Sequence, residues 1–228
     1  MNESRCSEVT SHWHRSLLRL GRPSVDDARH VTMSAHPGAR FLLGRSTMVE
    51  QSDGVWRFWF EELSPKQWFN SDAALDREVA DRFAVLHGRA ARCELYGWRA
   101  DARGRLAEIL VLDQFSRNIY RDRPEAFACD ALALGLAQEA VACGADDALP
   151  PEARSFLYMP YMHSESPIIH AEAERLFAQP GLENSLDFER RHRAIIERFG
   201  RYPHRNAILG RESTSEERAF LQQAGSGF

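Results

Sequence analysis

Apolar residues recur at helical spacing along the chain from about residue 52 onward. The clearest stripe joins Leu75, Val79, Phe83 and Leu86, which are three or four residues apart and therefore share one face of a helix. No segment of useful length alternates apolar and polar residues in the manner of a half-buried strand. The pattern predicts helices over residues 52–62, 72–91, 103–119, 130–143, 151–159, 167–178, 184–199 and about 214–223.

Glycine, proline and capping residues mark the ends of several of these helices. Gly144 and Gly200 each follow an apolar-periodic stretch and are typical of a helix C-terminus. Pro151 stands at a helix start, where a proline is tolerated, whereas Pro160 is expected to interrupt that helix. Residues 214–217 (TSEE) have the pattern of a capping box. We predict an all-α fold of antiparallel helical hairpins, arranged as a bundle or as a solenoid-like array.

The chain of 228 residues has room for one large domain, or for one domain with an appendage. Residues 1–48 differ from the rest because they hold four of the nine histidines and show little periodicity. We interpret residues 1–48 as a flexible N-terminal extension, or as the product of an upstream start site, since Met48 is an in-frame alternative. Residues 49–228 are then the all-helical domain.

The composition excludes some classes of function. A net charge of −4 argues against a general nucleic-acid binder, and no apolar run approaches the roughly 20 residues of a membrane span. The four cysteines (Cys6, Cys93, Cys129 and Cys143) have no metal-site spacing and are typical of a cytoplasmic protein. We predict no metal site and no cofactor, and the oligomeric state is left open. Lys66 is the only lysine among 29 basic residues, so a single arginine carries little weight.

The first segment with candidate chemistry is Leu112–Arg121 (LDQFSRNIYR). On a helix Asp113 and Arg117 are i,i+4 neighbours, and so are Gln114 and Asn118, so the two pairs would form one hydrogen-bonding patch. The alternative is an ordinary intrahelical ion pair beside two solvated amides.

The second segment is Phe156–Ser166 (FLYMPYMHSES). A helix broken at Pro160 would free carbonyl groups and turn the following side chains away from the helix axis. His163 and Glu165 could then form a proton-transfer pair in which the carboxylate orients the imidazole. The H-x-E spacing also occurs in zinc deaminases, but the PCxxC motif that they require is missing. The alternative is a buried histidine whose hydrogen bonds are satisfied.

The third segment, residues 199–217 (FGRYPHRNAILGRESTSEE), is the most informative. Within it lie five side chains suited to an anionic partner: Arg201, His204, Arg205, Asn206 and Arg211. A polar loop punctuated by glycine and proline between two helices is a common place for binding groups. The alternative is a loop whose cations cap neighbouring helix C-termini.

These motifs suggest one composite site, in which Arg117–Asn118 and Arg205–Asn206 lie near His163 and His204. The expected ligand is anionic, namely a phosphate, a nucleotide or a carboxylate.

Four stretches also make the chain resemble a known bacterial family, that of the domain of unknown function 924. They are the FWF around Trp59, LDQFSRNIYR, FLYMPYMHSES and FGRYPHRNAILGREST, and the resemblance covers about residues 52–228. The resemblance implies an all-α, tetratricopeptide-like arrangement and no established activity. Relatives typically follow the His-Ser-Glu with an acidic, Gln-containing stretch, whereas this chain has residues 166–170 (SPIIH), so its ligand could differ.

Three hypotheses follow. The first is a binding module that holds a small anionic molecule or an acidic peptide through Gln114 and Asn118 together with the arginines, His204 and Asn206. The second is a hydrolase-type enzyme that uses Asp113, His163 and Glu165 as acid–base groups, although no nucleophile elbow or phosphate loop is present. The third is a protein-interaction module in which the motifs only join helices.

Overall fold

The computed structural model describes residues 51–223, 225 and 226, and this part of the chain is helical with no strand. The all-α class is therefore confirmed, whereas the tetratricopeptide-like arrangement stays a prediction. The predicted extension at residues 1–48 lies outside the described residues. No helix in the described part is long and apolar enough to cross a membrane.

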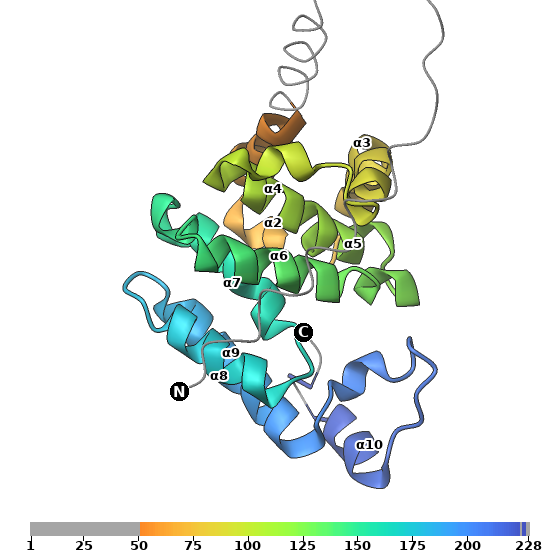
Figure 1. The fold of residues 1–228 in the computed structure, drawn as a ribbon. Coiled ribbons are helices and arrows are strands. Elements are labelled where there is room, and N and C mark those ends of the chain that lie inside the picture. Colours follow the sequence, from red (N-terminus) through yellow and green to blue (C-terminus); the bar gives the residue numbers. More distant parts are fainter. Residues whose placement is uncertain (1–50, 224, 227–228) are drawn as a thin grey trace, which may run out of the picture. The chain divides into compact units, whose positions relative to one another are not determined.

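The described elements follow one another in three groups along the chain (Figure 1). Helical residues 51–57 lead into η1 (Phe58–Glu62), α2 (Pro65–Trp68), α3 (Ala73–Ala91) and η2 (Tyr96–Ala100). The middle group is α4 (Ala102–Leu112), α5 (Gln114–Ile119), η3 (Pro124–Phe127), α6 (Asp130–Ala142), η4 (Asp146–Ala148) and α7 (Pro151–Met162). The last group is α8 (Pro167–Phe177), α9 (Glu183–Phe199), η5 (Pro203–Arg205) and α10 (Ser215–Leu221).

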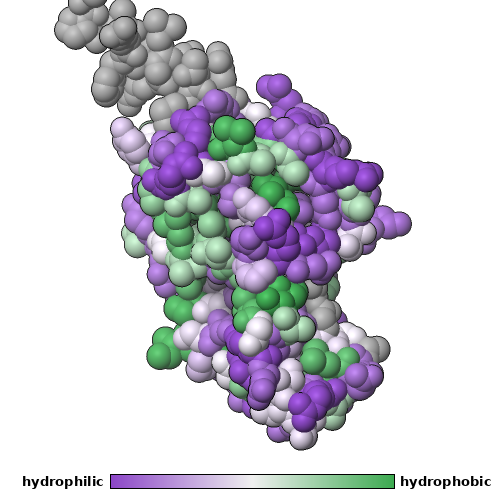
Figure 2. Space-filling model, turned by 90° about the vertical axis from the view of Figure 1, so that its right-hand side faces the viewer, coloured by the Kyte–Doolittle hydropathy of each residue, from purple (hydrophilic) through white to green (hydrophobic). Residues whose placement is uncertain are grey.

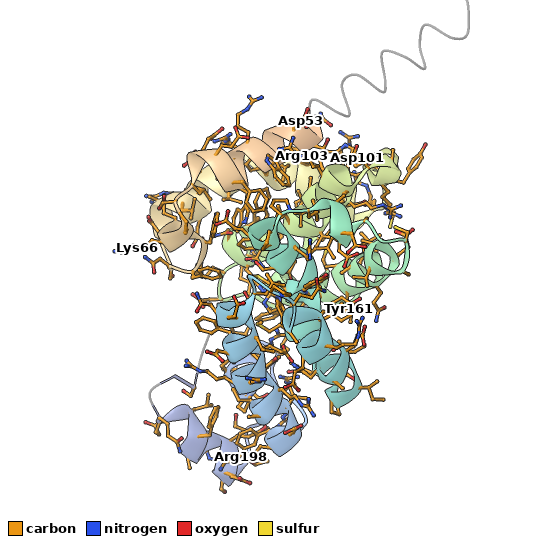
Figure 3. The ribbon with its side chains drawn as sticks, turned by 90° about the vertical axis from the view of Figure 1, so that its left-hand side faces the viewer. Asp53, Lys66, Asp101, Arg103, Tyr161 and Arg198 are labelled. Atoms are coloured by element: carbon orange, nitrogen blue, oxygen red, sulfur yellow. The ribbon has the colours of Figure 1, made fainter. Side chains whose placement is uncertain are left out.

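Helix α7 is the central packing element, since it contacts α4 and α6 on one side and α8 and α9 on the other. Figure 3 shows Tyr161, near the end of α7, in the middle of the molecule, and Arg198 at the far end of α9 beside α10. Apolar residues gather in patches on an otherwise mixed surface (Figure 2). The turn from α7 into α8 therefore brings residues 163–166 to the junction between the middle and last groups.

The main core is built on aromatic residues from separate elements. Trp59 of η1 packs edge-on against Phe156 of α7, with ring centroids 5.5 Å apart, and Phe83 of α3 lies 4.8 Å from Phe115 of α5. Such aromatic pairs add roughly 0.5–1.5 kcal/mol each beyond the area that they bury. Leu75, Val79 and Phe83 of the predicted stripe are buried, and Leu86 is partly buried. The helical spacing thus identified the face of α3 that packs on α5.

The predicted helix over residues 103–119 is wrong as a single element. The structure divides it into α4 and α5 at Asp113, whose φ and ψ are −96° and −66°. Neither glycine nor proline marks this break, so the local pattern does not reveal it. The break falls at a carboxylate that His163 contacts from fifty residues further along the chain, and such a tertiary hydrogen bond overrides helix propensity.

The predicted interruption at Pro160 is also wrong, because α7 continues to Met162. Pro160 itself is buried inside the helix, and the backbone N–H of His163 still donates to the Met159 carbonyl at 3.0 Å. Helices packed on both sides of α7 hold it in place, so the missing hydrogen bond does not end it. The residues after Pro160 therefore keep helical register up to His163.

The predicted ends of the last helices are confirmed. Gly200 ends α9 with a φ of 68°, in the left-handed region that favours glycine. At the start of α10 the Glu217 N–H donates to the Thr214 hydroxyl at 3.1 Å, and the Thr214 N–H donates to the Glu217 carboxylate at 2.6 Å. This is the predicted capping box, and it fixes the direction of the chain after the polar loop.

Candidate functional site

The centre of the site is Asp113, at the junction of α4 and α5, whose side chain is only 1% exposed. One of its oxygens, Oδ1, lies 2.8 Å from Nδ1 of His163 and 3.0 Å from Nη1 of Arg117. Gln114 donates to the other oxygen at 2.6 Å. Burial alone would raise the pKa of Asp113, but the positive charge of Arg117 and the hydrogen bond from His163 outweigh burial, and its pKa lies below the usual value.

His163 caps the C-terminus of α7 and is the partner of this carboxylate. Burial and the nearby charge of Arg117 lower its pKa, and the opposing effect of Asp113 does not cancel them. At neutral pH the imidazole is therefore neutral. Because Asp113 is ionised and only accepts, the ring proton resides on Nδ1, and Nε2 carries a lone pair.

The predicted pairing of His163 with Glu165 is wrong. Glu165 instead receives two hydrogen bonds from Arg211, at 2.6 and 2.9 Å, and one from the backbone N–H of Tyr202 at 2.8 Å. Burial would raise the pKa of Glu165, but the hydrogen bonds from Arg211 and Tyr202 lower it below the usual value. The two residues are close in sequence, but α7 ends at His163 and the chain then turns, so they engage different elements.

Asp130, the first residue of α6, joins the first and third motifs. Its carboxylate lies 3.1 Å from Nη1 of Arg117 and accepts from Nη1 of Arg205, also at 3.1 Å. The sequence analysis missed this residue, because an acidic residue at a helix start is ordinarily explained by the helix dipole. Nothing in the neighbouring sequence distinguishes an acidic residue that stabilises a helix dipole from one that binds distant arginines.

Arg205 is held by aromatic rings, a carboxylate and a backbone carbonyl, while its buried Nε makes no hydrogen bond to any of the described residues. Its guanidinium lies over the rings of Phe127 and Tyr202, 4.6 and 4.8 Å from their centroids. It also donates to the backbone carbonyl of His163 at 3.0 Å. Burial lowers the pKa of Arg205, yet arginine stays charged in proteins, and the adjacent carboxylate of Asp130 offsets that charge. Phe127 and Tyr202 are further site residues that the sequence analysis missed.

Several predicted binding residues lie outside this network. Asn118 donates to Asp76 at 2.8 Å rather than joining Gln114, so the two predicted stripes do not form one patch. Arg201 is bound to Glu217 at 2.7 and 2.9 Å.

Two further predicted residues lie beside the network. Asn206 accepts from Arg211 at 2.9 Å and supports the loop. The His204 ring packs on Tyr202, and burial lowers its pKa to about 4.

A cavity of about 400 Å³ opens beside the network. Five polar or charged residues line it: Asp130, His163, Ser164, Glu165 and Arg205. Its other walls are apolar and include Phe127, Leu134, Pro160 and Leu209. Asp113 and Arg117 are not among the lining residues and lie behind the polar wall. The three predicted segments therefore do meet, and two of them present side chains to one hollow.

The charges around the cavity are balanced within the chain. Arg117, Arg205 and Arg211 are matched by Asp113, Asp130 and Glu165 through the contacts described above. The expectation of an anionic ligand was based on arginines without such partners. It stays a prediction, and an anion would have to compete with carboxylates that are already in place. Among the residues that the structure describes, no group of His, Cys, Asp or Glu is arranged to hold a metal ion.

Comparisons with known proteins identify relatives of the chain but assign no activity. The model of a family described as "Bacterial protein of unknown function (DUF924)" matches residues 55–225. A solved structure of a protein of unknown function from Agrobacterium tumefaciens is 42% identical, with a TM-score of 0.73. The match covers 77% of this chain and 98% of that one. No curated protein matches the chain.

Proposed function

The chain belongs to the bacterial DUF924 family, and we propose that it binds a small molecule in the cavity beside His163. One observation supports this most: an imidazole oriented by a buried carboxylate lines a hollow of about 400 Å³ that is otherwise largely apolar. Cavities of about 300–1,000 Å³ with apolar walls and a few converging polar groups are the usual form of a small-molecule site.

The cost of the buried network supports a binding role rather than a purely structural one. Ionised groups such as Asp113 lose several kcal/mol of hydration on burial, and apolar residues of similar size often stabilise a fold equally well or better. A network placed only to join helices would gain nothing from an imidazole that lines a hollow. Perturbed titratable groups at the wall of a cavity are more typical of functional sites.

Acid–base catalysis is the second candidate function, and the orientation of His163 favours it. With Nδ1–H donating to Asp113 and the ring neutral, Nε2 is available to accept a proton from a bound molecule or from water. The predicted role of Glu165 in such chemistry is less well supported, because Arg211 and the backbone of Tyr202 already engage both of its oxygens. An acidic-peptide partner and a cytoplasmic location stay predictions from the sequence.

The test is a thermal-shift screen of the full chain with small fragments, using two variants that address the cavity. His163→Asn keeps an N–H donor for Asp113 and removes the Nε2 acceptor. Ala131→Trp places a large ring at an exposed α6 position that lines the cavity, so it fills the hollow without entering the core. Arg175→Gln, at an exposed ion pair of α8, is the matched control.

A ligand present at about 100 times its dissociation constant adds roughly 2.7 kcal/mol, which for a chain of this size raises Tm by roughly 5–10 °C. We expect fragments that stabilise the wild type and Arg175→Gln but not Ala131→Trp, with a weaker effect on His163→Asn. The proposal is wrong if no fragment stabilises the wild type, or if every hit stabilises Ala131→Trp equally.

A further inference from the structure

The polar groups in the cavity differ in how far they are exposed. The side chain of Glu165 is 27% exposed, that of Asp130 18% and that of His163 16%, whereas that of Arg205 is only 8% exposed. The two carboxylates and the imidazole are therefore more accessible to a bound molecule than the guanidinium is. This order is the reverse of the one that the arginine-rich sequence suggests.

The acceptor groups at the polar end of the cavity are partly occupied, but within the described part of the chain Oε2 of Glu165 accepts only one hydrogen bond, from Arg211, and can accept a second. Arg205 donates to Asp130 and to the His163 carbonyl, and the rings of Phe127 and Tyr202 pack against its guanidinium. Its third donor nitrogen, Nε, is buried. The neutral ring of His163 offers Nε2 as a lone pair, since Nδ1–H is committed to Asp113. Carboxylates accept hydrogen bonds and never donate while ionised. Among the charged residues that line the cavity, two are negative and one is positive, whereas Arg117 and Arg211, which pair with those carboxylates, are not among the lining residues.

We propose that the ligand of this cavity carries a protonated amine on an apolar body. This inference rests on the proposed function and assigns the charge of the ligand. A primary ammonium has three N–H donors and no acceptor, which matches a wall of carboxylates and an unprotonated imidazole nitrogen. The apolar body packs against the apolar lining residues, among them Phe127, Leu134 and Leu209.

A ligand with a carboxylate in the same place is disfavoured by the same contacts. It would approach Asp130 and Glu165, which carry like charge, and would gain only the shielded guanidinium of Arg205. Like charges brought together at a binding site weaken binding and serve to exclude the wrong partner.

Three probes that share one aromatic body and differ in charge test the inference: 2-phenylethylamine, 2-phenylethanol and 3-phenylpropionate. Their affinities for the full chain are measured by calorimetry at pH 7 and low salt. We expect the amine to bind at least tenfold more tightly than the alcohol and the carboxylate to bind more weakly than the alcohol. The same measurements on Ala131→Trp, whose larger side chain fills the cavity, show whether the probes bind there: their affinity should fall.

Asp130→Asn provides the matched variant, because it removes one negative charge and keeps the shape. We expect it to weaken the amine by at least fivefold, to strengthen the carboxylate, and to leave the neutral alcohol unchanged. An unchanged alcohol affinity shows that the cavity of the variant is intact. Tighter binding of the carboxylate than of the amine to the wild type, equal binding of all three probes, or binding of none would overturn the inference.

The proposed function is judged separately. It survives any of these three results if other fragments still stabilise the wild type and not Ala131→Trp. It fails only if that screen yields no such fragment.

Discussion

Two histidines that pack on Tyr202 should make the fold sensitive to acid. The rings of His192 and His204 lie 5.8 and 5.4 Å from that of Tyr202. Burial lowers the pKa of His192 to about 3 and that of His204 to about 4. In the unfolded chain a histidine has a pKa of about 6.5. At pH 5 both histidines are therefore neutral in the folded protein and charged in the unfolded protein.

The size of the effect follows from proton linkage. When the folded pKa is below the unfolded one, the stability present above the unfolded pKa is lost as the pH falls towards the folded value. For an unfolded pKa of about 6.5, each histidine costs about 2 kcal/mol at pH 5, or about 4 kcal/mol for the pair. The lowered pKa values of His87 and His163 act in the same direction. Domains are typically stable by only about 5–15 kcal/mol, so the loss is a large part of the total.

Urea unfolding followed by far-UV circular dichroism at pH 7.5, 6.5, 5.5 and 5.0 measures this loss. Near pH 5.5 the free energy of unfolding should fall by about 2.4 kcal/mol per pH unit for the pair. His192→Asn keeps an N–H donor for the Phe188 carbonyl, which Nδ1 of His192 contacts at 2.8 Å, and cannot titrate. This variant should lose about half of the pH dependence that His192 and His204 together give to the free energy of unfolding. A change below about 1 kcal/mol between pH 7.5 and 5.0, or a variant with the full slope, would refute the reasoning.

Two substitutions test other contacts. Asp113→Asn should cost about 3 kcal/mol in urea unfolding, because the partly buried guanidinium of Arg117 loses one of its carboxylates. It should also lower the pKa of His163 further, as NMR titration of the imidazole would show, since the Asp113 charge and hydrogen bond raise that pKa. An unchanged pKa of His163 would contradict the Asp113–His163 hydrogen bond. Gly104→Ala should cost about 1–3 kcal/mol, because a Cβ there would lie 2.1 Å from the Trp98 carbonyl oxygen. Gly135→Ala is the control, because a Cβ there has nothing within 4 Å, and it should stabilise α6 by up to about 1 kcal/mol. Equal effects of the two substitutions would refute the close approach of Gly104 to the Trp98 carbonyl.

Much of the fold was predictable from the sequence because the signals for helices are local. The stripe of α3, the end of α9 at Gly200 and the capping box of α10 each depend on residues within a few turns. The two boundaries that were wrong, at Asp113 and Pro160, were decided by groups distant in the chain. The carboxylate of Asp113 is bound by His163, fifty residues further along the chain. The helix around Pro160 is held by the helices that pack on α7.

The candidate site was predictable only as a set of segments. Asp113, His163 and Arg205 were each singled out from the sequence, because polar side chains in apolar segments need partners when buried, and the structure places them in one network. Their partners were not predictable. Glu165 binds Arg211 rather than His163, and Asp130 was not considered at all.

The sequence by itself determined the all-α class, the faces that pack and the three segments that carry polar chemistry, since these depend on periodicity and residue type. Only the tertiary structure decided which charges neutralise one another, and hence what the cavity presents. An arginine-rich sequence suggests an anion site, but the fold places a carboxylate against each arginine around the cavity. Electrostatic interactions depend on distance and burial in space, and neither is encoded in the spacing of residues along the chain.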